Sequence, residues 1–175
     1  IKNGVAISVD LSRNTENNLV GYKAKQHTSL IDVDKIAACQ INDYWDPVYT
    51  SSGKGGGLIL NPDEFYILMS KEFVTVPLDY AAEMRAYDTK VGEFRVHYAG
   101  FFDPGFGHAE SGGQGTRAVL EVRSHDVPFL IEDGQTVCRL IYEQMTQIPE
   151  KIYGAGGIGS NYPVSYTHLT LPTIY

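Results

Sequence analysis

The chain has few cysteines, no long apolar run and little positive charge. Its two cysteines, Cys39 and Cys138, lie far apart without a Cys-x-x-Cys motif, which argues against a disulfide framework and a cysteine-based metal site. No apolar stretch is long enough for a membrane helix, so we expect no membrane association. The 14 Lys and Arg stand against 21 Asp and Glu, and the formal net charge of -7 disfavours a nucleic-acid polymer as partner. A reducing cytoplasm fits these features best.

The chain begins with Ile1 instead of methionine and has no signal peptide. We expect residues 1–162 to form one domain, the C-terminal part of a longer protein whose N-terminal half is missing. Residues 163–175 (PVSYTHLTLPTIY) share neither the turn pattern nor the charge pattern of the rest, and they resemble a translated sequencing adapter. We therefore leave this non-native tail out of the functional interpretation.

Short segments rich in Val, Ile, Phe and Tyr dominate the sequence, and turn motifs such as Asn-Pro-Asp and Asp-Pro-Gly separate them. The expected strands lie within residues 4–12, 19–25, 29–34, 58–77, 92–102, 116–124, 127–132 and 135–145. This pattern predicts an all-β fold in which opposed sheets share one core. Short helices are expected over 77–84 and 32–39, because a proline or an aspartate opens each of these Ala-containing segments.

The segment 116–124 (TRAVLEVRS) alternates between apolar and polar residues. Its even-numbered apolar residues fall on one face, as expected for a strand that covers a core. Glu121 falls on the opposite face together with Arg117 and Arg123. From the strand alone, a surface ion pair with one of these arginines is a simpler interpretation of Glu121 than catalysis.

Two short motifs share letters with known sites but lack their context. Residues 154–159 (GAGGIG) have the spacing of a dinucleotide-binding loop, but no strand precedes them and no helix follows, which favours a glycine-rich tail able to close over a ligand. Residues 108–110 (HAE) match half of the zinc-deaminase signature, whose Pro-Cys-x-x-Cys half is absent. We expect any deamination by this chain to proceed without zinc.

Four segments resemble the dCTP deaminase family of the dUTPase-like superfamily. They are AGFFDPGF (99–106), GTRAVLEV (115–122), VPFLIEDGQTVCRLIYEQM (127–145) and YGAGGIGSNY (153–162). The likeness is strongest to the C-terminal half of a longer, two-domain bacterial form. It implies a distorted jelly roll, or dUTPase-like β-barrel, with one or two short helices. It also implies a trimer or trimer-like arrangement with active sites between the units.

The same resemblance implies an activity and a set of site residues. The family converts dCTP and water to dUTP and ammonia in pyrimidine deoxynucleotide biosynthesis, without zinc and with magnesium carried on the triphosphate. Glu121 matches the general base, which takes a proton from the attacking water and passes it to the departing nitrogen. Substrate-binding positions are matched by Ala99, Asp103, Gly105, Phe106, Lys90, Tyr153 and Tyr162. dTTP is a candidate regulator.

The chain departs from the family pattern in the catalytic segment. The family has Arg-Ser-Ser-x-x-Arg-x-Gly, whereas residues 85–92 read RAYDTKVG, so both serines and the second arginine are replaced. Phe101 stands where many relatives have an arginine. We therefore expect the missing N-terminal half to supply the serine and arginine set in a composite pocket. Two alternatives stay open: a dUTP pyrophosphatase, and a non-catalytic half that binds nucleotide or completes the oligomer.

Overall fold

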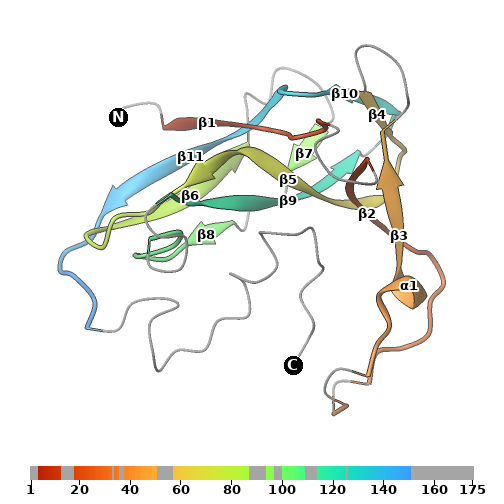
Figure 1. Cartoon of the computed structure of the whole chain (residues 1–175), viewed down its shortest axis with the longest axis horizontal. Coiled ribbons are helices and arrows are strands. Elements are labelled where there is room, and N and C mark those ends of the chain that lie inside the picture. Colours follow the sequence, from red (N-terminus) through yellow and green to blue (C-terminus); the bar gives the residue numbers. More distant parts are fainter. Residues whose placement is uncertain are drawn as a thin grey trace.

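The regular structure of the chain is almost entirely antiparallel β-strand, as a computed structural model shows (Figure 1). The structure describes residues 4–12, 18–32, 34–35, 38–50, 57–86, 94–96, 100–108, 114–124 and 126–150. The strands group into sheets of four, two and five strands. The all-β prediction with a short helix is confirmed.

The four-stranded sheet has the order β1-β11-β6-β8. Its strands are β1 (Val5–Ser8), β11 (Thr136–Gln144), β6 (Tyr80–Ala86) and β8 (Phe101–Phe102). The two-stranded sheet pairs β10 (Phe129–Glu132) with β4 (Gly57–Leu60).

The five-stranded sheet has the order β3-β2-β5-β9-β7. Its strands are β3 (Trp45–Tyr49), β2 (Leu19–Ala24), β5 (Phe65–Val74), β9 (Thr116–Ser124) and β7 (Phe94–Val96). Between β2 and β3 the chain leaves the sheets at the lower right of Figure 1 and carries the single-turn helix α1 (Ile41–Tyr44).

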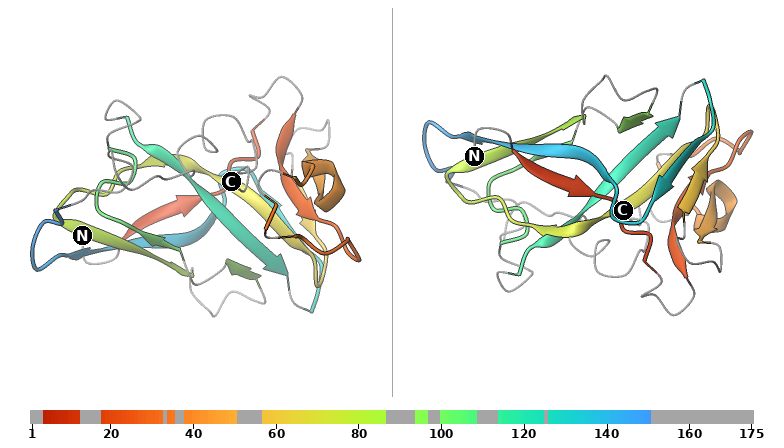
Figure 2. Two further views of the ribbon diagram at one scale, coloured as in Figure 1. Left: turned by 90° about the horizontal axis from the view of Figure 1, so that it is seen from below. Right: turned by 90° about the horizontal axis from the view of Figure 1, so that it is seen from above.

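One apolar core joins the three sheets. Ile7 and Leu140 come from the four-stranded sheet, Leu60 from the two-stranded sheet, and Leu68 and Leu120 from the five-stranded sheet, and all are fully buried. Both views of Figure 2 show β9 running at an angle across β11, so different layers enclose this core. Burial of each such side chain contributes about 1.5–3 kcal/mol, and the strands are held together mainly by this shared core.

The helix expected over residues 77–84 is wrong. The Tyr80 N–H donates to the Pro77 carbonyl oxygen at 3.1 Å and closes a turn, and β6 begins at Tyr80. β6 then pairs along its whole length with β11. Ala82 and Met84 point into the core, which is the period of a strand and not of a helix. Burial against β11 therefore outweighs the local helical preference of this alanine-containing segment.

The region before β3 also differs from expectation. The described residues of 32–39 hold a turn, in which Lys35 N–H donates to the Asp32 carbonyl oxygen at 3.2 Å, and neither these residues nor the described part of 29–34 form the expected helix or strand. β3, which contains Pro47, is not among the strands expected from the sequence. An edge strand tolerates proline, since its outer N–H groups need no partner within the sheet. In the part of the chain that the structure describes, no helix has the length and apolar character needed to cross a membrane.

Candidate functional site

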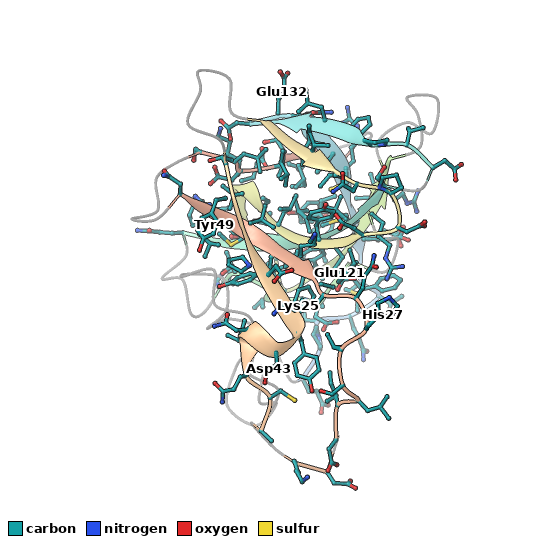
Figure 3. The ribbon with its side chains drawn as sticks, turned by 90° about the vertical axis from the view of Figure 1, so that its right-hand side faces the viewer. Lys25, His27, Asp43, Tyr49, Glu121 and Glu132 are labelled. Carbon is teal, nitrogen blue, oxygen red and sulfur yellow. The ribbon has the colours of Figure 1, made fainter. Side chains whose placement is uncertain are left out.

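Glu121 lies on the outer face of the five-stranded sheet, in the second half of β9. Its neighbours Leu120 and Val122 are buried in the core, and the Glu121 side chain is exposed. The two-faced strand predicted for 116–124 is therefore confirmed. Figure 3 shows Glu121 near the middle of the view and Glu132, which belongs to another sheet, at the top.

Cross-strand register places an apolar row beside Glu121. Glu121 is opposite Ile67 on β5, Ile67 is opposite Tyr22 on β2, and Tyr22 is opposite Pro47 on β3. Ile67 and Tyr22 are half-buried. Burial, and secondarily Tyr49, raises the pKa of the Tyr22 hydroxyl above its ordinary value. The outer face of the sheet thus has partly buried apolar side chains next to the Glu121 carboxylate.

A second row, one step along the same face, consists of aromatic rings and a guanidinium group. The rings of Trp45 and Phe65 are 6.0 Å apart between centroids. The Arg123 guanidinium lies over the Phe65 ring, 4.9 Å from its centroid. Arg123 is exposed and opposite Phe65 in register. Since residues two apart on a strand share a face, Arg123 lies on the same side of the sheet as Glu121.

Arg117, the other arginine of β9, is already engaged. Its guanidinium forms an ion pair with the Asp10 carboxylate, whose side chain is only 9% exposed, and lies over the Phe73 ring. Burial alone would raise the pKa of Asp10, but hydrogen bonds from Ser12 and Arg117 outweigh it and leave that pKa below its ordinary value. The ion pair considered for Glu121 with Arg117 is therefore replaced by one between residues 107 positions apart.

The ion pair between Asp10 and Arg117 is expected to contribute to the stability of the fold. Asp10→Asn is expected to lower the free energy of unfolding by about 1–3 kcal/mol at neutral pH, because it removes a charged acceptor from a partly buried arginine. The pKa of Asp10 is lowered in the folded state, so its contribution is present above the ordinary value of 3.8 and is lost as the pH falls through the lower, folded value. Urea unfolding of both proteins at pH 7 and at about pH 3 tests this.

The matched control for this prediction is Asp46→Asn. The Asp46 carboxylate is 50% exposed and lies 3.6 Å from Lys25, so its replacement is expected to cost less than about 1 kcal/mol. A cost for Asp10→Asn that is the same at both pH values would contradict the assignment.

The Asp-Pro-Gly turn is hydrogen-bonded to the residues that follow β5. The Gly105 N–H donates to the Val76 carbonyl oxygen at 3.0 Å, and the Val76 N–H donates to the Phe106 carbonyl oxygen at 2.9 Å. Phe106 is buried and meets Phe102 edge-on, with centroids 4.9 Å apart, so its ring packs into the core. The Asp103 side chain is exposed. Asp103 is thus the exposed side chain of this turn, whereas residues 104–106 are buried.

The turn and Glu121 are well separated within one chain. Gly107, just after the turn, is so close to the Val74 carbonyl oxygen and the Thr116 N–H that an added Cβ would lie 2.2 Å and 3.0 Å from them. The turn therefore lies next to Thr116, the first residue of β9. Five residues of regular strand, about 17 Å, separate Thr116 from Glu121.

Several predicted site residues lie outside the described residues: Lys90, Ala99, Tyr153 and Tyr162. The tail 163–175 does too. Within the described ranges, no group of three or more His, Cys, Asp and Glu side chains is placed to hold a metal ion. The zinc-free prediction stays a prediction.

Comparison with known families shows to which protein family the chain belongs. Residues 1–171 match the family model described as 2'-deoxycytidine 5'-triphosphate deaminase, C-terminal domain. The chain belongs to the dCTP deaminase family. The resemblance noted from the four sequence segments is confirmed.

Individual members of the dCTP deaminase family are similar over part of their length. The chain is 34% identical over 112 residues to a protein of Methanobrevibacter smithii and 28% identical over 133 residues to one of Methanothermobacter thermautotrophicus, both named dCTP deaminase, dUMP-forming. These matches cover 62% and 74% of this chain, and 54% and 62% of the two relatives. The chain thus spans little more than half the length of these curated relatives.

A solved structure supports the fold directly. The crystal structure of 2'-deoxycytidine 5'-triphosphate deaminase from Agrobacterium tumefaciens is 58% identical and superposes with a TM-score of 0.77, over 89% of this chain and 44% of that chain. The antiparallel sheets described above are consistent with the dUTPase-like fold expected for the dCTP deaminase family.

Sequence reasoning did not single out Ile67, which is opposite Glu121, or Tyr22, which is the next residue in the same cross-strand row. They are ordinary strand residues in no motif, and only the register of β2, β5 and β9 brings them together. Arg123 was considered only as an ion-pair partner. Its position two residues after Glu121 was the available signal for a shared face.

Proposed function

We propose that the chain supplies the proton-transferring carboxylate of a dCTP deaminase, as the C-terminal part of a composite enzyme. The reaction is the zinc-independent hydrolysis of dCTP to dUTP and ammonia. The observation that carries the proposal is the position of Glu121, an exposed carboxylate beside the half-buried Ile67 and Tyr22, in a chain of the dCTP deaminase family. The substrate is the magnesium complex of dCTP, with the metal carried by the triphosphate.

Glu121 acts as base and then as acid in this mechanism. The carboxylate takes a proton from water while the water oxygen bonds to C4 of cytosine, the ring carbon that bears the amine, and it passes this proton to ring N3 as the C4–N3 double bond is lost. Glu121 then takes the hydrogen of the new C4 hydroxyl and passes it to the exocyclic nitrogen, the C4–N bond breaks, and ammonia leaves as the C4 carbonyl of uracil forms. Water supplies the oxygen and two hydrogens, so dCTP and water are converted to dUTP and ammonia.

The site is composite because one chain does not bring all its parts together. A carboxylate must lie within about 3 Å of the proton that it moves, directly or through one water. A base held against the Asp-Pro-Gly turn would be out of reach of Glu121 of the same chain, since about 17 Å of β9 lies between Thr116 and Glu121. The N-terminal half of the longer protein, in a trimer-like arrangement, completes each pocket and supplies the serines and the arginine that residues 85–92 lack.

The remaining assignments follow from the family and are part of the same proposal. Asp103 and Gly105 contact the deoxyribose through the turn, and Phe106 supports that turn from the core. Lys90, Ala99, Tyr153 and Tyr162 complete the substrate contacts. dTTP is the proposed regulator, and the cytoplasm, where deoxynucleotides are made, is the proposed location.

A domain exchange tests this function. Residues 1–162 replace the matching part of the Agrobacterium tumefaciens deaminase, to which the chain is 58% identical. The exchanged protein is expected to release ammonia from dCTP at a rate within about tenfold of the parent rate. A tenfold loss corresponds to about 1.4 kcal/mol of transition-state stabilisation, and a correctly placed Glu121 is expected to keep the loss below this value. The control lacks residues 1–162 and is expected to be inactive. A folded exchange protein that releases no ammonia would contradict the proposal.

A second candidate product is dUMP, because both archaeal relatives described above are named dUMP-forming. That reaction consumes a second water, which breaks the bond between the α- and β-phosphates and releases pyrophosphate. Chromatography of the products distinguishes the two outcomes: dUTP with ammonia alone, or dUMP with ammonia and pyrophosphate.

A further inference from the structure

We propose that Arg123 binds the phosphate groups of the nucleotide whose base reacts at Glu121. This inference rests on the proposed function and adds to it an anion-binding residue on the same sheet face. Arg123 and Glu121 are two residues apart on β9, so their Cα atoms are separated by about 7 Å and their side chains leave the same side of the strand.

The Arg123 guanidinium lies over an aromatic ring. It is 4.9 Å from the centroid of the Phe65 ring, and the centroid of the Trp45 ring is 6.0 Å from the same centroid. Ala24 occupies the β2 position opposite Trp45, and its small side chain leaves room for the two rings to meet. A guanidinium group stacked on a ring keeps its N–H donors at the edges of the plane, where a phosphate binds in two-pronged fashion.

Arg117 is an internal comparison for Arg123. Both arginines lie on β9 over a phenylalanine ring, but Arg117 is ion-paired with the nearly buried Asp10. Among the described residues, no carboxylate forms an ion pair with Arg123. Arg117 thus neutralises a carboxylate within the fold, whereas Arg123 lies on the exposed face of the sheet, where its charge can bind an anion.

Calorimetry on the 175-residue chain tests the inference with four probes: dCTP, dCMP, deoxycytidine and inorganic tripolyphosphate. Arg123→Gln is expected to raise the Kd of dCTP at least about tenfold and to leave that of deoxycytidine unchanged, since the lost contacts are charge-assisted hydrogen bonds to phosphate. Arg123→Lys keeps the charge without the planar fork, and its Kd of dCTP is expected to lie between those of the unmodified chain and Arg123→Gln. Lys35→Gln is the matched control, because its ammonium is 69% exposed and paired with Asp32 on the excursion between β2 and β3.

Three results would overturn the inference: an unchanged Kd of dCTP in Arg123→Gln, an equal loss for dCTP and deoxycytidine, or an unmodified chain that does not distinguish these two probes. Thermal unfolding of Arg123→Gln separates lost binding from lost folding. Failure of the proposed function is recognised separately. If Glu121→Gln stays active in the domain-exchange enzyme while dCTP binding still depends on Arg123, Glu121 loses its role and Arg123 keeps its own.

Discussion

Replacing Glu121 with glutamine is expected to lower the rate of ammonia release from dCTP by about 10²- to 10⁴-fold, the usual contribution of a general acid–base residue. Glutamine has the size of glutamate but cannot accept a proton from water at neutral pH. The Glu121 side chain is exposed on the outer face of β9, so no core contact is lost with the charge. The rate is measured in the domain-exchange enzyme with saturating dCTP, and the Kd of dCTP is measured beside it.

Glu132→Gln is the matched control for this substitution. Glu132 is an exposed strand glutamate like Glu121, but it lies on β10 of the two-stranded sheet, at the top of the view in Figure 3, whereas Glu121 is near the middle. Its replacement is expected to leave the rate unchanged. If Glu121→Gln reduces the rate less than about threefold, which is under 1 kcal/mol, Glu121 does not transfer the proton.

Leu68→Ala is expected to lower the free energy of unfolding by about 2–5 kcal/mol. Leu68 is 0% exposed on β5 and lies directly opposite Leu120, which is also 0% exposed, on β9. The truncation removes buried methyl groups and leaves a cavity at the centre of the five-stranded sheet. Since a domain has only about 5–15 kcal/mol of stability in total, the variant is expected to be close to unfolding at room temperature. Urea unfolding followed by circular dichroism gives the difference.

The comparison variant is Leu130→Ala on β10. Leu130 is 56% exposed, so the same chemical change is expected to cost no more than about 0.5 kcal/mol. Equal costs for the two leucines would mean that the core does not lie between the sheets as described.

The alternation of β9 is the part of the candidate site that its own residues predict. A period of two puts Leu120 and Val122 on the core side and Glu121 on the other, whatever the neighbouring strand. The turn at 103–105 is equally local, because Asp, Pro and Gly favour its backbone angles, and Gly105 indeed has a φ of 93°. Features of this kind are predictable because neighbours in sequence decide them.

The segment 77–84 illustrates the opposite case. Its proline followed by alanines is typical of a helix, but Ala82 and Met84 are buried in a strand paired with β11, more than fifty residues later in the chain. The partner of Arg117 was likewise not predictable, since Asp10 is 107 residues away. Nor does any local pattern place Tyr22 beside Ile67 and Glu121.

By itself, the sequence determined the all-β class, the two faces of β9 and the kinship carried by its motifs, because each depends on the types and spacing of nearby residues. Only the tertiary structure decided which residues surround Glu121, that Arg117 is committed to Asp10 while Arg123 lies over Phe65, and that the Asp-Pro-Gly turn stands about 17 Å of strand away. The physical reason is that strand pairing and core burial join segments distant in the chain, and no local preference encodes their register.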